Sequence, residues 1–188
     1  LVREIDALGI RNITIASSSV HLVNAEIIPY IQKGVITRLE CGVNGLIGEM
    51  ISKGELNCPI TVRSHGGRAR SLITGEVAVD VAFLAAPCCD EYGNFNGMYG
   101  PSACGSLGYA LVDAQHAHKV VAVTDNLVPF PAVPVSIPQS VVDFVVQVPS
   151  LGDPKKIVSS TLKITTDPIN LQIAKYATMV IEASGYLK

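Results

Sequence analysis

Short runs of Val, Ile and Ala alternate along this chain with stretches that have helical periodicity. Six of these runs are predicted to be strands: Ile13–Ser17, Ile36–Cys41, Ile60–Ser64, Val79–Ala85, Lys119–Thr124 and Val142–Val148. Several lack regular polar alternation, which is typical of strands that are covered on both faces. Such strands separated by helices indicate an α/β fold, with a mostly parallel sheet and helices on both faces.

Helices are predicted between these strands at Val20–Lys33, Asn44–Lys53 and Pro101–Ala117. A last helix is predicted to begin at Asp167-Pro168, because an acid at the N-cap followed by proline is a common helix start. Its apolar residues share one face, and they are Ile169, Ile173, Tyr176, Ala177, Val180 and Ile181.

Length and composition narrow the classes of protein. A chain of 188 residues can form one domain with a sizeable core. Its most apolar run, Val77–Cys89, contains Asp80 and a proline and is much shorter than the ~20 residues that span a membrane. The net charge of −2 gives no electrostatic basis for nucleic-acid binding. We therefore expect neither membrane nor nucleic acid as a partner.

The cysteines indicate a cytoplasmic protein. There are five, Cys41, Cys58, Cys88, Cys89 and Cys104, and they include no CxxC pair. An odd number without such pairs predicts neither a disulfide framework nor a zinc site. We expect buried, reduced thiols, as in the cytoplasm. The chain begins with Leu1 instead of Met, so we expect a natural N-terminal segment to be missing.

Two segments interrupt the regular pattern, the proline-rich residues 129–138 and the Gly- and Asn-rich residues 88–105. Long irregular loops are usually functional. Ligands of open parallel sheets bind beyond the carboxyl ends of the strands. The predicted strand ends therefore direct attention to residues 17–19, 64–67, 87–88 and 124–126.

The segment from Arg63 to Arg70 is the most informative of these strand ends. Gly66 and Gly67 allow backbone N–H groups to approach an anion closely. Arg68 offers a planar fork for a carboxylate, and His65 can donate a hydrogen bond to an oxyanion. The alternative is an ordinary turn with solvated arginines, and the position after a strand favours a site.

A second stretch lies in the Gly- and Asn-rich loop. Asn94 and Asn96 could hydrogen-bond a polar ligand, and a helix start near Ser102 would offer free N–H groups. The alternative is an Asn/Gly turn with tight packing at Gly105 and Gly108. The glycine spacing matches neither GxGxxG nor a P-loop, so nucleotide phosphate binding is not indicated.

Other candidates are weaker. His21 follows three serines, but without a GxSxG elbow a helix cap is the more ordinary explanation. Cys88 and Cys104 have no evident base, and Asp80 is expected to be a satisfied buried acid. The pair of histidines at a predicted helix end is expected at the surface and not in a metal site: His116 and His118.

Five blocks of sequence resemble the citrate lyase α subunit family, whose members are citrate CoA-transferases. They are SHGGRAR at 64–70, VDVAFLAAPCCDEYGN at 79–94, NGMYGPSACGSLGYA at 96–110, VTDNLVPFP at 123–131 and SLGDPKKIVSSTLKITTDP at 150–168. The resemblance extends from about Ile13 to Lys175, and its long ordered blocks are more specific than any glycine motif. The DEYGN-type loop is similar to CoA transferases in general.

The resemblance implies a CoA-transferase/ribose-phosphate-isomerase-like fold with two such domains in each subunit. Residues 1–175 would form the first domain without its opening segment. Residues 176–188 would end a helix that leads towards a second, absent domain. Implied partners are a β subunit that cleaves the citryl thioester and an acyl carrier (γ) subunit.

The implied activity exchanges acetyl for citryl on a thiol. A citrate carboxylate would attack the acetyl thioester to give a mixed anhydride, and the released thiol would attack the citryl side. The chain itself would bind no cofactor, because the CoA-like thiol of the acyl carrier, or free CoA, is a substrate. The family resembles CoA transferases that work through a ternary complex, so no catalytic glutamate is expected in this chain.

Within this resemblance, His65 with the amides of Gly66 and Gly67 is expected to stabilise the oxyanion. The other expected site residues bind or orient substrate, and they are Ser64, Arg68, Asn94, Asn96, Ser102 and Asn126. Two alternatives stay open. One is an acyl-CoA:carboxylate CoA transferase with another acceptor, and the other is a non-catalytic small-molecule sensor of the same fold.

Overall fold

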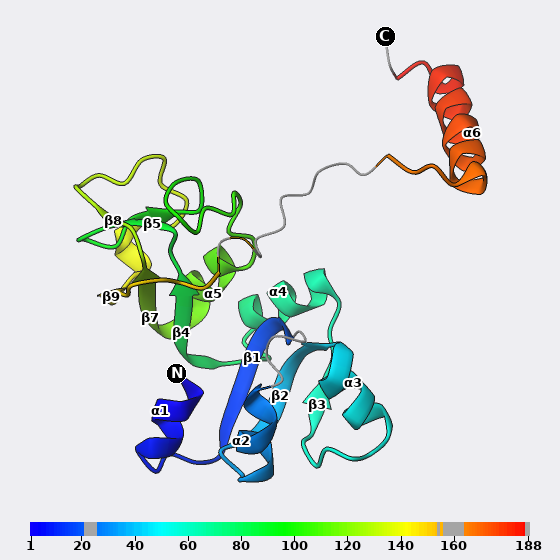
Figure 1. Ribbon diagram of the computed structural model, residues 1–188. Helices are drawn as coiled ribbons and strands as arrows, with labels where there is room; N and C mark the ends of the chain where they lie inside the picture. The colour runs from blue at the N-terminus through cyan, green and yellow to red at the C-terminus, as the bar shows by residue number, and fades with distance from the viewer. Residues whose placement is uncertain (21–25, 154, 156–163, 187–188) are drawn as a thin grey trace. The chain divides into compact units, whose positions relative to one another are not determined.

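The computed structural model describes residues 1–20, 26–153, 155 and 164–186, and it divides into two units, Leu1–Pro154 and Lys155–Lys188 (Figure 1). The helices of the first unit are α1 (Val2–Ala7), α2 (Ile28–Gln32), α3 (Gly45–Ser52), α4 (His65–Ile73), α5 (Ala110–His116) and the 3₁₀ turn η2 (Gln139–Val141). Its strands are β1 (Ile13–Val20), β2 (Ile36–Val43), β3 (Ile60–Thr61), β4 (Val79–Ala85), β5 (Cys88–Asp90), β6 (Phe95–Asn96), β7 (Ala117–Thr124), β8 (Leu127–Val128) and β9 (Phe144–Gln147). The second unit contains α6 (Pro168–Ser184).

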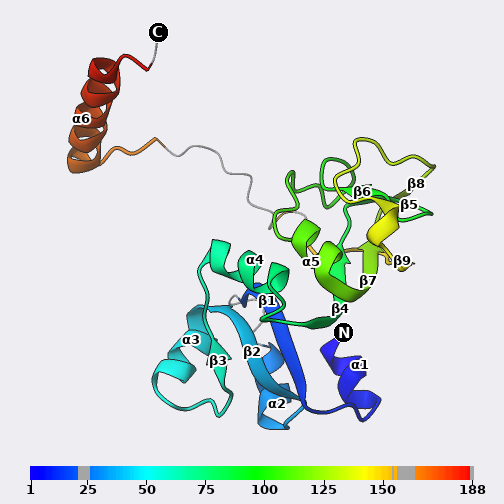
Figure 2. The ribbon, with the colours of Figure 1, turned by 180° about the vertical axis from the view of Figure 1, so that it is seen from behind.

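The described strands form three sheets of three strands each. The orders are β1-β2-β3, β4-β7-β9 and β6-β5-β8, and every pair is parallel except β5 with β6. Figure 2 shows β1 and β4 from behind, each in its own sheet. The mainly parallel α/β fold is therefore confirmed, although its strands are divided among separate sheets.

Each of the two parallel sheets has its own hydrophobic cluster. One cluster joins β4, β7 and α5, and its buried residues include Leu84, Phe95, Ala114, Val120 and Ile137. The other joins β2, α2 and α3, and its buried residues include Ile31, Ile36, Leu39, Cys41 and Ile47. Burying each large apolar side chain, such as Leu, Ile, Val or Phe, contributes about 1.5–3 kcal/mol, so these clusters hold the helices against the sheets.

Several predicted elements are confirmed. β4 has the predicted bounds, and α3 lies within the predicted helix 44–53. At the start of α6, the Asp167 carboxylate accepts a hydrogen bond from the Ile169 N–H at 2.8 Å. Gly185 ends this helix in the left-handed conformation, with φ of 72°. The expected domain boundary between residues 175 and 176 falls inside α6.

Three predictions of local structure were wrong. The helix expected at 101–117 is only α5, because residues 101–109 turn through the positive φ angles of Gly105 and Gly108. β1 continues to Val20, and α2 starts only at Ile28, with Pro29 in its first turn. The predicted strand 60–64 is two residues long, and the following segment forms α4. His21 lies outside the described residues.

Three polar residues that the sequence analysis considered as weaker site candidates are at the surface. Asp80 is exposed, so the expected buried acid was wrong there. His116 and His118 are exposed, as expected. The described residues include no helix that is both long and apolar enough to cross a membrane.

The cysteines differ from the sequence expectation at one position. Four thiols are buried, but Cys104 is exposed, because it lies in the irregular segment that replaces the expected helix.

Maleimide should therefore label the native protein once, at Cys104, and a Cys104→Ser variant should stay unlabelled until it is denatured. Mass spectrometry of the labelled protein measures this. Rapid labelling of a second cysteine in the native protein would contradict the burial of the other four.

Candidate active site

A cavity of about 330 Å³, lined by both polar and apolar residues, lies where β1 and β2 end and α4 begins. It is lined by residues 16–19 of β1, 40–43 of β2, 63–65 before and at the start of α4, and 68, 71, 72 and 77. This is the carboxyl end of two parallel strands, the usual position of ligands in such sheets. The cavity therefore contains three of the predicted site residues, Ser64, His65 and Arg68.

The start of α4 is fixed by a side-chain cap. Ser64 has an extended backbone, and its Oγ accepts a hydrogen bond from the Gly67 N–H at 3.1 Å. A Cβ at position 67 would approach Ser64 Oγ to 2.8 Å, so a larger residue there would displace this cap. The N–H groups of His65 and Gly66 belong to the first turn, which has no acceptors within the helix. They are the donors that this helix end leaves for an anion.

Arg68 is the central cation of the cavity, and it is only 7% exposed. Its Nη2 donates to Asp113 Oδ1 of α5 at 2.6 Å, and its guanidinium lies 5.5 Å from the centre of the Tyr109 ring. Its Nη1 is buried and has no hydrogen-bond partner. A buried charged donor without a partner is uncommon in folded proteins, and here its residue lines a cavity. The arginine is thus held in place with one donor left for a ligand.

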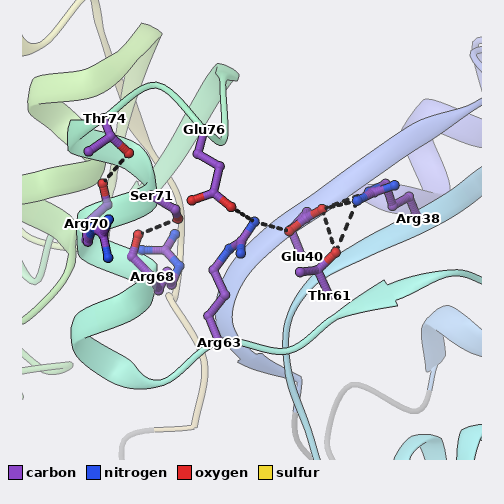
Figure 3. A network of polar contacts seen from close by, with 9 residues as sticks. All are labelled: Arg38, Glu40, Thr61, Arg63, Arg68, Arg70, Ser71, Thr74 and Glu76. Carbon is purple, nitrogen blue, oxygen red and sulfur yellow. Dashed lines mark hydrogen bonds and ion pairs between the residues drawn. The ribbon is translucent and has the colours of Figure 1, made fainter.

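A second arginine on the cavity wall is held in a network of ion pairs (Figure 3). Arg63 Nη2 lies 3.4 Å from Glu40 Oε2 and 3.2 Å from Glu76 Oε1. The other oxygen of Glu40 accepts from Arg38 at 2.8 Å and from Thr61 at 2.9 Å. Arg63 Nε is buried without a hydrogen-bond partner. Arg63 and Arg68 thus both line the cavity, and each has one buried donor without a hydrogen-bond partner.

The remaining groups near the cavity are suited to hydrogen bonding and not to nucleophilic attack. The exposed His65 ring stacks on Tyr109, with centroids 5.8 Å apart and planes inclined by 19°. Burial raises the pKa of the Cys41 thiol, although the Ser17 hydroxyl opposes this shift. The thiolate is the nucleophilic form, so a raised pKa keeps Cys41 unreactive.

The Asn- and Gly-rich loop is not part of this cavity wall. The Asn94 amide donates to Asp90 at 2.9 Å and to Gln139 at 3.0 Å, and its oxygen accepts the Gln139 N–H. Asn96 is fully buried, and its oxygen accepts the Met98 N–H. These side chains hold the loop together, and their expected contact with substrate stays a prediction.

Two further predicted site residues also make internal contacts. Ser102 donates to Asp125 at 2.5 Å, and it lies in a turn, so the helix start expected beside it was wrong. The Asn126 N–H donates to Thr124 Oγ1 at 3.1 Å. A Cβ at Gly100 would meet the Asn126 side chain and the Pro87 carbonyl. These contacts pack Ser102 and Asn126 against their neighbours, whereas Met98 and Tyr99 of the loop are more than half exposed.

Asp90 organises the same loop and was missed by the sequence reasoning. It is fully buried, and its carboxylate accepts hydrogen bonds from the backbone of Tyr92, Asn94 and Ala132 at 2.9–3.1 Å. Burial acts to raise the pKa of Asp90, but these hydrogen bonds together with that of the Asn94 side chain lower it. Glu40 and Asp113 were also missed. An acid within an apolar run was the available signal for Glu40.

The packing of the loop gives a test with a matched pair of glycines. A Cβ at Gly97 would collide with the Gly105 carbonyl and the Leu107 side chain, whereas a Cβ at Gly66 would meet nothing within 4 Å. Gly97→Ala should lower the free energy of unfolding by ~2 kcal/mol through overpacking. Gly66→Ala should leave it unchanged or raise it by up to ~1 kcal/mol. Chemical denaturation compares the two, and equal effects would contradict the packing described.

Comparison with known proteins decides the family. A model of the citrate lyase alpha subunit family matches residues 1–188. The chain belongs to the citrate lyase alpha subunit family. It is 47% identical to the citrate lyase alpha chain of Haemophilus influenzae and 46% identical to that of Klebsiella pneumoniae. All of this chain is covered in both comparisons, but only 38% and 37% of those relatives, so it spans little more than a third of their length.

Solved structures agree with this assignment. The putative alpha subunit of citrate lyase from Streptococcus mutans, solved in complex with citrate, is 47% identical with a TM-score of 0.91. That comparison covers all of this chain and 37% of the other. An acyl-CoA transferase from Escherichia coli O157:H7, in a thioester complex with CoA, is 18% identical with a TM-score of 0.58, over 89% of this chain and 44% of the other. The latter similarity shows the shared CoA-transferase fold alone.

Proposed function

We propose that this chain belongs to the citrate CoA-transferase component of citrate lyase, and that its cavity binds carboxylate groups of citrate. The observation that carries the proposal is the pair of buried, unpartnered donors, Arg63 Nε and Arg68 Nη1, on one cavity. Arginine is the side chain best suited to carboxylates. A volume of about 330 Å³ lies at the small end of ligand sites, which is appropriate for a small polycarboxylate.

The chemistry that we propose needs an oxyanion donor beside the carboxylate site. One citrate carboxylate attacks the acetyl thioester carbon, the tetrahedral oxyanion collapses, and the thiolate leaves, which forms a mixed anhydride. The thiolate then attacks the citryl carbonyl, and acetate leaves. The N–H groups of His65 and Gly66, with the His65 ring, are our proposed donors to the oxyanion. Gly67 would join them only by giving up its bond to Ser64.

The rest of the assembly is proposed from the family. The thiol would come from an acyl carrier subunit, or from free CoA, as a substrate and not as a resident cofactor. A β subunit would cleave the citryl thioester, and a second CoA-transferase-like domain would complete the site in the cytoplasm. The predicted site residues outside the cavity would orient substrate indirectly, because their internal contacts fix the shape of the backbone around them. They are Asn94, Asn96, Ser102 and Asn126.

The experiment is an assay of the full-length subunit for citryl-CoA formation from acetyl-CoA and citrate, with succinate as the control acceptor. Citrate-selective transfer supports the proposal. Transfer to succinate and not to citrate would instead identify the protein as an acyl-CoA:carboxylate CoA transferase with another acceptor. Transfer to neither acceptor, with binding of a small ligand, would favour the non-catalytic sensor.

A further inference from the structure

Two site side chains of α4 share one aromatic neighbour. His65 and Arg68 are three residues apart, so they lie on the same side of this helix. The His65 ring stacks on Tyr109 with centroids 5.8 Å apart, and the Arg68 guanidinium lies over the same ring at 5.5 Å from its centre. One ring therefore contacts both the proposed oxyanion donor and the proposed carboxylate donor.

This tyrosine and the acid that binds Arg68 come from the same turn of helix. Tyr109 is the N-cap of α5, and its carbonyl accepts a hydrogen bond from the Asp113 N–H at 3.0 Å. Residues four apart lie on one side of a helix, and their contacts with Arg68 show that this side is turned towards α4. Gly108, with φ of 55°, supplies the turn directly before Tyr109. The loop and α5 thus present an aromatic ring and a carboxylate together to α4.

Tyr109 contacts these side chains from outside the carboxylate cavity. His65 and Arg68 line that cavity, whereas Tyr109 and Asp113 are not among the described residues that do so. Among the residues that the structure describes, Tyr109 also belongs to neither hydrophobic cluster. Packing of a core therefore does not account for the position of this ring, and an action through its two neighbours does.

The ion pair of Arg68 with Asp113 favours the same interpretation. The two side chains are only 9% and 14% exposed. At such burial the cost of removing both charges from water offsets much of their attraction, so a pair of this kind contributes little net stability. A planar guanidinium that is bonded at Nη2 and lies over an aromatic ring is, however, restricted in its orientation. The contacts of Arg68 are thus suited to orienting its fork.

We propose that Tyr109 is a positioning residue, which fixes the His65 ring and the Arg68 guanidinium relative to each other. In the first step of the transfer, the attacking carboxylate oxygen and the developing oxyanion are bonded to the same carbon. Their binding groups must therefore keep a fixed separation, and a displacement of about 1 Å can slow a reaction by a factor of ~100. This inference rests on the proposed function, because it concerns the two groups that this function uses.

Tyr109→Leu in the full-length subunit should lower kcat for citryl-CoA formation by a factor of about 10 to 100. The KM for citrate should change much less, because Arg68 keeps its charge and its bond to Asp113, and the lost alignment matters in the transition state. Tyr109→Phe retains the ring and should have wild-type kinetics. A value of kcat for Tyr109→Leu equal to that of the wild type would overturn the proposal.

Tyr30→Leu is the matched control for a purely structural effect. Lys33 lies over the Tyr30 ring at the same distance of 5.5 Å, and neither residue lines the carboxylate cavity. Both Tyr→Leu variants should lower the melting temperature, but only Tyr109→Leu should lower kcat at a temperature where both are folded. Equal losses of kcat in the two variants would contradict a positioning role.

Double-mutant cycles test whether Tyr109 acts through both partners. Interacting residues give non-additive effects, whereas independent ones give additive effects. Tyr109→Leu should therefore cost less in kcat/KM when His65→Ala is already present, and also when Arg68→Ala is present. Full additivity with either variant would remove that partner and overturn the proposed coupling.

A readout at His65 separates this inference from the proposed function. In a subunit labelled with ¹³C-histidine, the His65 ring protons should carry a ring-current shift that Tyr109→Leu removes and Tyr30→Leu does not. His65→Ala identifies the signal, and a signal that Tyr109→Leu leaves in place would overturn the proposal whatever the assay shows. If the shift behaves as expected but the wild type does not transfer to citrate, the proposed function fails, and the positioning role fails with it. If the wild type does transfer to citrate and Tyr109→Leu transfers equally well, the positioning role alone fails.

Discussion

Arg68→Ala in the full-length subunit should lower kcat/KM for citrate by a factor of about 10 to 100. The variant removes a cavity-lining guanidinium whose buried Nη1 has no partner among the described residues. Hydrogen bonds to charged groups contribute about 1.5–3 kcal/mol, which corresponds to this range. Arg68→Lys keeps the charge but loses the planar fork, so its activity should fall between those of Arg68→Ala and the wild type.

The control for this prediction is Arg70→Ala on the same helix, because Arg70 is exposed and does not line the cavity. Its kinetics should match the wild type. A second readout separates binding from folding, since Arg68 also pairs with Asp113. Citrate should raise the melting temperature of the wild type and of Arg70→Ala, but not of Arg68→Ala. An unchanged citrate response in Arg68→Ala would remove this arginine from the site.

Asp90→Ala should be the most destabilising single substitution considered in this chain, at about 3–5 kcal/mol. It leaves the backbone N–H groups of Asn94 and Ala132 without their acceptor in a buried loop. Each buried donor left unsatisfied costs about 1–3 kcal/mol. The adjacent Glu91 is exposed, so Glu91→Ala should change the free energy of unfolding by less than ~0.5 kcal/mol. Urea denaturation at pH 7 measures both variants.

The effect of Asp90 should also depend on pH, with a sign fixed by its lowered pKa. A carboxyl group whose pKa is lower in the folded state stabilises the protein above its unfolded pKa of ~3.9. That contribution is lost as the pH falls through the folded pKa. The stability difference between wild type and Asp90→Asn should therefore be constant from pH 7 to 5 and decrease below pH 4. A difference that grows on acidification would contradict the assignment.

The strands show what hydrophobic pattern can predict. β4 and β7 were predictable as apolar runs because each places alternate side chains in the core, whereas Val81 and Phe83 of β4 are nearly half exposed. The start of α6 was equally predictable, since Asp167 and Pro168 act through local geometry alone. The helix expected from Pro101 failed for the opposite reason. Its small residues have no strong periodicity, and the contacts at Gly97 and Gly100 override local preference.

The α/β class, the family resemblance and the candidate residues Ser64, His65 and Arg68 were predictable without the structure. These follow from local patterns and from residue types after a strand. The folded molecule, in contrast, was needed to show that Arg68 is buried, that it contacts Asp113 and Tyr109, and that Arg63 shares its cavity. It also showed that Asn94 and Asn96 make internal contacts. These facts depend on residues far apart in the chain, and a pattern within one segment carries no information about such distant partners.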